Sequence, residues 1–368
     1  MTLANSGTIN VAATTATISS VLAGSVGLTK TGSGTLVISG AETYTGATNI
    51  NAGTLQLGAA NRIPNNSAVT VASGATLDVH GFGETVASIA GAGNITLGAA
   101  SGSLQVSGAA STTFSGVISG AGFLQKAGTG TLTLSGANSY TGVTNINRGT
   151  LRLGADNALS NSTAVTVASG ATLDLNSYDD TIGSLAGAGI VTLGSGTLTV
   201  GANNASTTFS GSFTSGDTGT LAKTGTGTLT FGAGMNLSSG NLVLSGGTLN
   251  LGGFSSAFDS LAVTANSVLD FGTSGNSILN LNSLSVASGV TLTIANWTNA
   301  VDYFYSLANP GATNLGRIVF TGFSGADTKW LSYDHQITPV PEPSVYGAAL
   351  LGVCALFAGW RRQRQRTA

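Results

Sequence analysis

Residues 28–58 read LTKTGSGTLVISGAETYTGATNINAGTLQLG, and residues 124–154 read LQKAGTGTLTLSGANSYTGVTNINRGTLRLG. These stretches open a longer internal repeat, in which 28–98 aligns without a gap on 124–194 at an offset of 96 residues. A third, partial copy begins at residue 221 with LAKTGTGTLTF. Because self-similarity at a fixed period is typical of repeat architectures, this repeat decides the fold class.

A shorter period of about twenty residues runs inside each copy. The element Thr-Leu recurs at steps of 19, 22 and 20 residues in both copies. Each element alternates apolar and polar side chains and ends at Gly, Asn or Ser-Gly, which is the pattern of short half-buried strands joined by tight turns. The sequence therefore predicts an all-β parallel β-helix, or β-solenoid, with right-handed crossovers. About fifteen turns would give a rod on the order of 70 Å long.

Composition excludes several classes of function. Only 7% of the 368 residues are charged, and the formal net charge is −2. Nucleic-acid binding needs clustered Lys and Arg side chains that face the phosphates. Because charged residues are so few, we expect no nucleic-acid partner. The one cysteine, Cys354, supports neither a disulfide framework nor a cysteine metal site. We expect no metal and no cofactor.

The amino terminus, MTLANSGTIN, has neither a basic nor an apolar region, so the sequence predicts no secretory signal peptide there. The repeat also opens in mid-pattern, since residues 18–28 parallel residues 114–124. One alternative is therefore a truncated passenger fragment without independent function.

A second alternative is a carbohydrate-active β-helix enzyme, either a polysaccharide lyase or a hydrolase. Such chemistry needs carboxylates that converge on one face. Asp78, Asp174 and Asp270 occupy similar elements in distant turns, so we do not expect them to meet. The sequence predicts no catalytic residue and no enzyme activity.

Asp179 and Asp180 form an adjacent acidic pair, and the first copy has Gly83 and Glu84 at the same place. Because this position varies between the copies, we expect a solvated loop there.

Histidine and lysine are two other residue types that commonly form functional sites. His80 and His335 have no cysteine or second histidine nearby in the sequence, which argues against metal binding. Lys30, Lys126 and Lys223 hold the same slot in three copies, which indicates a repeated structural position.

Paired asparagines recur at equivalent positions of the two long copies, Asn49 with Asn51 and Asn145 with Asn147. We expect turn residues at the corners of the solenoid, where asparagine tolerates left-handed backbone. Stacked amide ladders are the alternative.

The repeated string TKTGSGTLVISGAETYTGATNINAGTLQLG resembles the autotransporter-associated β-strand repeat of large bacterial passenger proteins. The resemblance is strong for the two long copies and weakens towards residue 296. It implies a β-helical rod on the cell exterior.

The chain ends TPVPEPSVYGAALLGVCALFAGWRRQRQRTA, which resembles a PEP-CTERM sorting signal. The motif residues are Pro341, Glu342 and Pro343, followed by an apolar segment over 345–360. The membrane-flanking basic cluster consists of Arg361, Arg362, Arg364 and Arg366. In that family an exosortase-type enzyme processes the tail, so the resemblance implies this partner.

The physics of the tail agrees with this interpretation. A helix over 345–360 would be about 24 Å long, which spans a membrane when its flanking side chains snorkel. The arginines would stay on the cytoplasmic side of the inner membrane. Pro341 and Pro343 would keep the motif extended and open to processing.

These patterns divide the chain into a solenoid over 1–296, an aromatic-rich segment over 297–338 and a sorting tail over 339–368. We expect the aromatic segment to cap the last open turn, with a ligand-binding aromatic surface as the alternative. The function expected from the whole chain is an exported structural or adhesive rod. Its polar columns would face envelope or extracellular polysaccharide.

Overall fold

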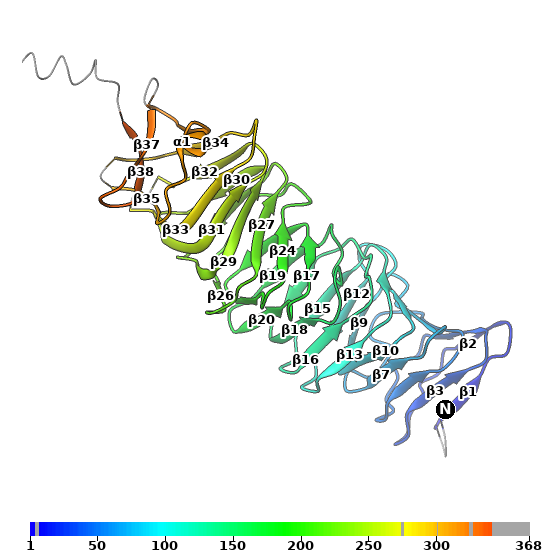
Figure 1. The fold of residues 1–368 in the computed structure, drawn as a ribbon. Helices are drawn as coiled ribbons and strands as arrows, with labels where there is room; N and C mark the ends of the chain where they lie inside the picture. Colours follow the sequence, from blue (N-terminus) through cyan, green and yellow to red (C-terminus); the bar gives the residue numbers. More distant parts are fainter. Residues whose placement is uncertain (4–6, 274–275, 300, 324–326, 341–368) are drawn as a thin grey trace, which may run out of the picture.

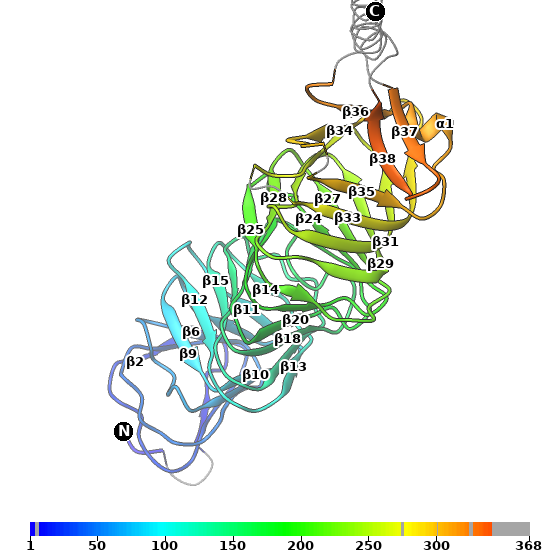
Figure 2. The same ribbon diagram turned by 90° about the vertical axis from the view of Figure 1, so that its left-hand side faces the viewer.

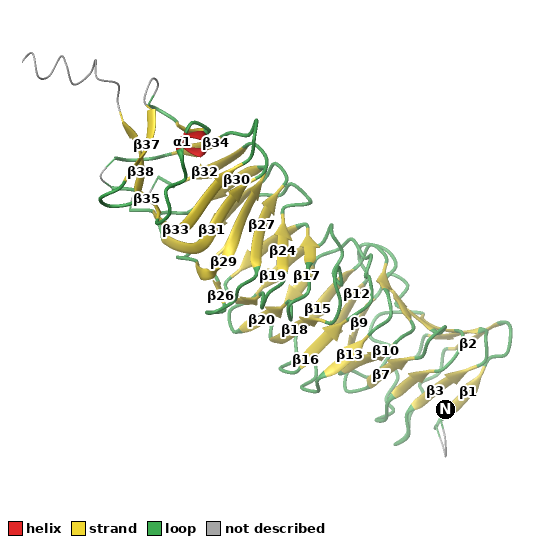
Figure 3. Ribbon diagram, viewed as in Figure 1, coloured by secondary structure: helices red, strands yellow, loops and turns green. Residues whose placement is uncertain are grey.

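The computed structural model describes residues 1–3, 7–273, 276–299, 301–323 and 327–340. Within these residues the chain winds into an all-β parallel solenoid of about 14 turns, which confirms the predicted fold class. Figure 1 shows the rod with its amino-terminal turns at one end and the last strands at the other. Figure 3 shows that strands and short turns make up nearly all of it.

Two sheets begin at the amino-terminal end. The first sheet contains, in order, β1 (Thr8–Asn10), β3 (Leu28–Thr31), β5 (Thr48–Ile50), β7 (Ala68–Val71), β10 (Ser88–Gly91), β13 (Thr112–Phe114), β16 (Thr131–Leu134), β18 (Gly149–Leu153), β20 (Ala171–Asp174), β23 (Ile190–Thr192) and β26 (Ser212–Phe213). The second sheet contains β2 (Thr15–Ile18), β4 (Thr35–Ile38), β6 (Thr54–Leu57), β8 (Thr76–Asp78), β11 (Asn94–Thr96) and β14 (Ile118–Ser119).

Two further sheets extend to the carboxyl-terminal end. The third contains β9 (Gly83–Val86), β12 (Ser103–Val106), β15 (Phe123–Lys126), β17 (Thr144–Ile146), β19 (Ala164–Val167), β22 (Ser184–Gly187), β25 (Thr207–Phe209), β28 (Thr228–Phe231), β30 (Gly247–Asn250), β32 (Ser267–Asp270), β34 (Leu292–Ala295) and β36 (Ile318–Phe320). The fourth contains β21 (Asp180–Ile182), β24 (Thr197–Val200), β27 (Thr220–Thr224), β29 (Asn236–Ser245), β31 (Ser255–Val263), β33 (Ile278–Val286), β35 (Tyr303–Ser306), β38 (Gln336–Val340) and β37 (Asp327–Leu331).

The second and fourth sheets lie on one side of the coil, so the rod has three faces. The amide of Ser139 donates to the carbonyl of Ile118 in the second sheet (2.9 Å). The amide of Asn157 donates to the carbonyl of Asp179, just before the fourth sheet (2.8 Å). The stretches around Ser139 and Asn157 therefore connect the two sheets on that face without forming a strand.

The 96-residue repeat does not contain a whole number of turns. Its first copy starts on β3 of the first sheet, the second on β15 of the third, and the partial copy on β27 of the fourth. Between β3 and β15 the chain makes four complete turns and passes two further faces. Residues that are equivalent in the repeat therefore point to three different sides of the rod.

A single apolar core runs through the coil. Inward-facing leucine, isoleucine and valine side chains stack from turn to turn, as in the register of Leu36, Leu55 and Leu77 on the second sheet. All three are fully buried. Burying each such side chain contributes about 1.5–3 kcal/mol, so a turn stabilises its neighbours by covering their apolar side.

The carboxyl-terminal end departs from the parallel pattern. After β35 come the short α1 (Ala312–Leu315) and β36, and then β37 and β38 pair antiparallel. β38 also pairs antiparallel with β35 (Figure 2). The hydrophobic helix expected over 345–360 lies outside the described residues. Within the described ranges, α1 has four residues, and no helix is long and apolar enough to cross a bilayer.

Candidate functional site

The repeated lysines are buried and bind the backbone of neighbouring turns. Lys30, Lys126 and Lys223 are at most 1% exposed. The Nζ of Lys30 donates to three carbonyls, of which that of Ala52 belongs to the next turn (3.0 Å). The Nζ of Lys126 likewise reaches the carbonyl of Arg148 (3.2 Å). Burial lowers the pKa of each lysine. These contacts agree with a repeated structural position.

The three aspartates of the repeated strand element do not converge. Asp78 lies on β8, Asp174 on β20 and Asp270 on β32, which belong to three different sheets. Each contacts a side chain of the preceding turn, and Asp174 pairs with the guanidinium of Arg152 (Nε to Oδ2, 2.7 Å). More than four turns along the rod separate each aspartate from the next, and the rotation of the repeat also places them on different faces.

The prediction of a solvated loop was wrong for Asp180. Its side chain is 2% exposed, and Oδ2 accepts the backbone N–H of Leu159 from the preceding turn (2.9 Å). Glu84 is 1% exposed and accepts the N–H of Arg62 in the same way (2.8 Å). Asp179 is exposed, as expected. The buried carboxylates satisfy N–H groups that no strand pairing reaches at this corner.

The buried environment changes the acidity of both carboxyls. Removal from water raises the pKa of Glu84 to about 7 and that of Asp180 to about 7, although backbone N–H donors oppose the rise. Both groups face the interior, so this shift marks a structural position.

The paired asparagines divide between strands and corners. Asn49 lies inside β5 and Asn145 inside β17, where the strand alternation directs them outward. Neither they nor Asn51 and Asn147, which follow the strands, adopt left-handed backbone. The left-handed asparagines are instead Asn61, Asn157, Asn176, Asn204, Asn276 and Asn296. The turn prediction was wrong for Asn49 and Asn145, because the Thr-Asn-Ile strands contain them. Asn51 and Asn147 do lie in the links between β5 and β6 and between β17 and β18, but without left-handed backbone.

The histidines lie apart. His80 Nδ1 is 3.6 Å from Asp78 Oδ2, and the ring of His335 lies 5.7 Å from that of Trp330. In the part of the chain that the structure describes, no three His, Cys, Asp or Glu side chains are placed to hold a metal ion. The sorting-motif residues Pro341, Glu342 and Pro343 and the arginine cluster lie outside the described residues.

The aromatic segment contributes both core and surface. Trp297 packs edge-on against Phe271 and Phe320, with ring centroids 5.0 and 5.1 Å apart. Tyr303 and Tyr305, on β35, point outward, and their rings stack at 5.6 Å with an interplanar angle of 3°. Aromatic side chains of this segment thus pack into the core on one face and stand on the surface on the other.

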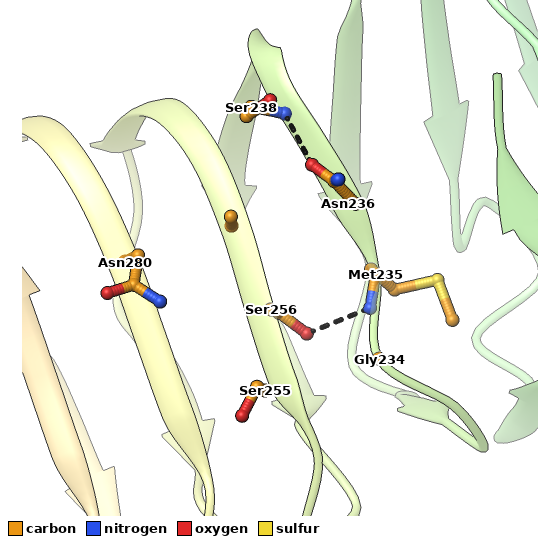
Figure 4. A pocket seen from close by; sticks show the side chains of 8 residues that line it. Gly234, Met235, Asn236, Ser238, Ser255, Ser256 and Asn280 are labelled. Atoms are coloured by element: carbon orange, nitrogen blue, oxygen red, sulfur yellow. Dashed lines mark hydrogen bonds between the residues drawn. The ribbon is translucent and has the colours of Figure 1, made fainter. Parts of the chain in front are cut away.

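A shallow groove of about 390 Å³ lies across β29, β31 and β33 (Figure 4). The groove is lined by Gly234, Met235, Asn236, Ser238, Ser255, Ser256, Ala257 and Asn280. In Figure 4, Asn280 stands on β33, next to β31. The Ser256 hydroxyl on β31 accepts a hydrogen bond from the backbone N–H of Met235 (3.2 Å). The groove exists because its floor carries only small side chains between the taller asparagines.

Strand register connects the groove to the tyrosines. Asn236 pairs with Ala257, Ala257 with Asn280, and Asn280 with Tyr305, which places these four residues in one outward row. Since paired residues of parallel strands point to the same side, the row runs from the groove onto the aromatic pair.

A second outward row runs beside the first. Ser255 pairs with Ile278, and Ile278 with Tyr303. We call the two rows together the groove–tyrosine surface: Asn236, Ala257, Asn280 and Tyr305, with Ser255, Ile278 and Tyr303.

The groove–tyrosine surface is electrically neutral. Among the residues that the structure describes, none that lines the groove carries a charge. Burial, Tyr303 and the nearby Asp334 together raise the pKa of Tyr305, which favours its uncharged phenol. The surface offers amides, hydroxyls and aromatic rings, a chemistry suited to binding.

Sequence reasoning missed this surface. Three of its strands, β29, β31 and β33, are nine or ten residues long and bend around a corner, with a register shift in β29 between Leu237 and Asn241. The spacing of the four residues in the first row is irregular, so no fixed period aligns them. The alternation in NLSSGNLVLS was the available signal, because it runs beyond one short strand.

Comparison with known proteins agrees with the repeat architecture. Residues 28–57, 124–153 and 221–251 match the model of the Passenger-associated-transport-repeat. The chain is also 35% identical over 289 residues to Adhesin BmaC autotransporter of Brucella suis biovar 1 (strain 1330). That alignment covers 74% of this chain and 8% of the relative, so the chain spans a small part of the relative's length. No solved structure matches the chain.

Proposed function

We propose that this chain is an exported bacterial surface protein whose solenoid serves as a structural and adhesive rod. The observation that carries the proposal is the stacked solenoid, whose repeats match a passenger repeat and whose sequence is similar to part of an adhesin. Its faces are poor in charge and rich in Thr, Ser and Asn. Such faces favour many shallow polar contacts along the rod over one deep site.

The adhesive role is tested with microspheres coated with the full chain and passed under flow over cells and over purified envelope polysaccharide. We expect at least tenfold more retained microspheres than with an albumin coat. Retention equal to that of albumin on every surface would contradict the adhesive role.

We further propose that the tail is a PEP-CTERM-type sorting signal. The motif Pro341, Glu342 and Pro343, the apolar segment 345–360 and the terminal arginines stand in the order that such signals require. The apolar segment would hold the chain in the inner membrane until an exosortase-type enzyme cuts near the motif. The rod would then be released or attached at the envelope.

The hairpin of β37 and β38 is proposed to cap the solenoid. The indole Nε1 of Trp330 donates to the carbonyl of Ser306 on β35 (2.8 Å), and β38 pairs with the same strand. An uncovered end would expose strand edges and apolar core, which favours aggregation. Antiparallel pairing ends the parallel stacking at this point.

The proposed role is not catalytic. The aspartates of the repeated element lie on three faces, and Glu84 and Asp180 are committed to backbone N–H groups. Paired-carboxylate chemistry on a glycan needs two such groups on one groove. The groove described above is lined by amides and hydroxyls, which supports binding.

A further inference from the structure

We propose that the groove–tyrosine surface is a binding site for a neutral oligosaccharide chain. The proposal rests on the adhesive role and names the ligand class that this part of the rod would hold. A sugar ring offers hydroxyls around its edge and apolar C–H groups on its faces. A matching site needs groups that both donate and accept hydrogen bonds, next to a flat apolar surface.

The polar requirement is met by the groove. Asn280, Asn236 and Ser255 are exposed at its floor and sides. Asparagine amides and serine hydroxyls each donate and accept hydrogen bonds, so they suit hydroxyl partners in either orientation. Asn236 Oδ1 already accepts the backbone N–H of Ser238 (3.3 Å), which orients its amide group along the groove (Figure 4).

The apolar requirement is met by the tyrosines. Tyr303 and Tyr305 are partly exposed, and their mutual stacking holds both rings in place. Tyrosine supplies a large rigid contact area at a low cost in conformational entropy, and asparagine and serine add adaptable hydrogen bonds. Ile278 extends the apolar wall toward the groove.

The dimensions fit a chain rather than a single sugar. From β29 to β35 the surface crosses three strand spacings, about 14 Å in all. The groups stand on paired strands, so little order has to be gained on binding. A site this open implies weak affinity, on the order of millimolar, which many copies of the rod at a cell surface would strengthen through avidity.

The absence of charge among the described lining residues decides the class of glycan. An acidic polysaccharide would find no cation in the groove, and Asp334 lies near Tyr305. A neutral chain meets no such repulsion.

The test measures binding of the full chain to hexasaccharides of β-1,3-glucan, β-1,4-glucan and α-1,4-glucan, with an alginate hexasaccharide as the acidic probe. Saturation-transfer NMR detects weak binding and provides titration curves. We expect at least one neutral hexasaccharide to bind and the alginate probe not to bind. Asn280→Ala and Tyr305→Ala should each weaken that binding about tenfold, and Ser255→Trp, which fills the groove, should abolish it.

Two substitutions serve as matched controls. Asn282 stands two residues from Asn280 on the same outward side of β33 but does not line the groove, so Asn282→Ala should leave binding unchanged. Tyr333→Ala controls for the loss of a surface tyrosine, because Tyr333 is 81% exposed and lies outside the groove–tyrosine surface, and it should leave binding unchanged. Circular dichroism and melting curves confirm that each variant folds.

The proposal is overturned if no neutral hexasaccharide binds, if the alginate probe binds best, or if the folded groove variants bind as well as the natural chain. The microsphere assay separates this outcome from failure of the adhesive role. If no neutral hexasaccharide binds while microspheres coated with the natural chain are retained, the site is removed and the adhesive role stands. If a neutral hexasaccharide binds but the microspheres are not retained, the site stands and the adhesive role fails.

Discussion

Individual polar residues inside this solenoid join one turn to the next. Lys30 donates hydrogen bonds to carbonyls of its own turn and the next. Asp180 and Glu84 accept hydrogen bonds from backbone N–H groups of the preceding turn. Each contact satisfies backbone groups at a corner, where the strand ladders are interrupted. An unsatisfied buried polar group costs about 1–3 kcal/mol, which explains why charged side chains occupy an otherwise apolar interior.

The buried carboxyls make stability depend on pH. Because their folded pKa of about 7 exceeds the ordinary values of 4.5 and 3.8, the folded state binds more protons between about pH 4 and pH 7. Stability should therefore fall as pH rises through that window. Replacing both groups by Glu84→Gln and Asp180→Asn should reduce the fall by on the order of 2 kcal/mol per site, measured by urea unfolding at pH 5 and pH 8.

The exposed neighbour provides the control for this experiment. Asp179→Asn alters an adjacent carboxylate that faces solvent, and it should keep the pH dependence of the natural chain. Equal pH dependence in the double variant and the natural chain would show that the two buried carboxyls do not titrate as described.

At the scale of the element, glycine corners set how closely turns approach. Gly187 has φ of 105°, and a Cβ there would stand 2.1 Å from the carbonyl oxygen of Val167 in the preceding turn. Gly170 has φ of 78°, but a Cβ there would meet no atom within 4 Å. An alanine at either position would therefore carry backbone strain, but only an alanine at Gly187 would also collide with the neighbouring turn.

We predict that Gly187→Ala destabilises the solenoid by at least about 2 kcal/mol more than Gly170→Ala, which should cost only about 1–2 kcal/mol of left-handed strain. Hydrogen exchange of the amides around β19 and β22 would locate the loss, since the collision acts between those strands. Similar protection in both variants would contradict the stacking of turns described here.

Much of the fold could be predicted because its signals are local. The repeated Thr-Leu element and its step of about twenty residues specify strand, turn and coil, and Leu36, Leu55 and Leu77 stack as that step requires. The burial of Asp180 could not be predicted in this way. It depends on the N–H of Leu159, which lies in another turn and which no local pattern reveals.

The candidate surface was hidden for a related reason. Asn236, Asn280 and Tyr305 stand in one row only after the bulge in β29 and the bend of the long strands fix their register. Aromatic enrichment near the end of the solenoid did indicate a change of role. It did not reveal that Trp297 would face the core while the tyrosine pair faces outward.

At the scale of the whole molecule, the repeat distributes its features around the rod. One copy advances the chain by four turns and two further faces, so equivalent residues never form a single column. Equivalent residues of the repeat therefore occur on different sides of the rod. This geometry suits a rod that makes contacts along its length, with the groove–tyrosine surface close to its carboxyl-terminal end.

The most direct test of the account is to locate the protein in its source organism and determine its mature carboxyl terminus by mass spectrometry. The account predicts protein that an external antibody reaches on intact cells or in the medium, with a terminus close to Pro341–Pro343. Protein that stays inside the cell and keeps its Arg361–Ala368 tail would contradict the proposal of an exported, sorted surface rod.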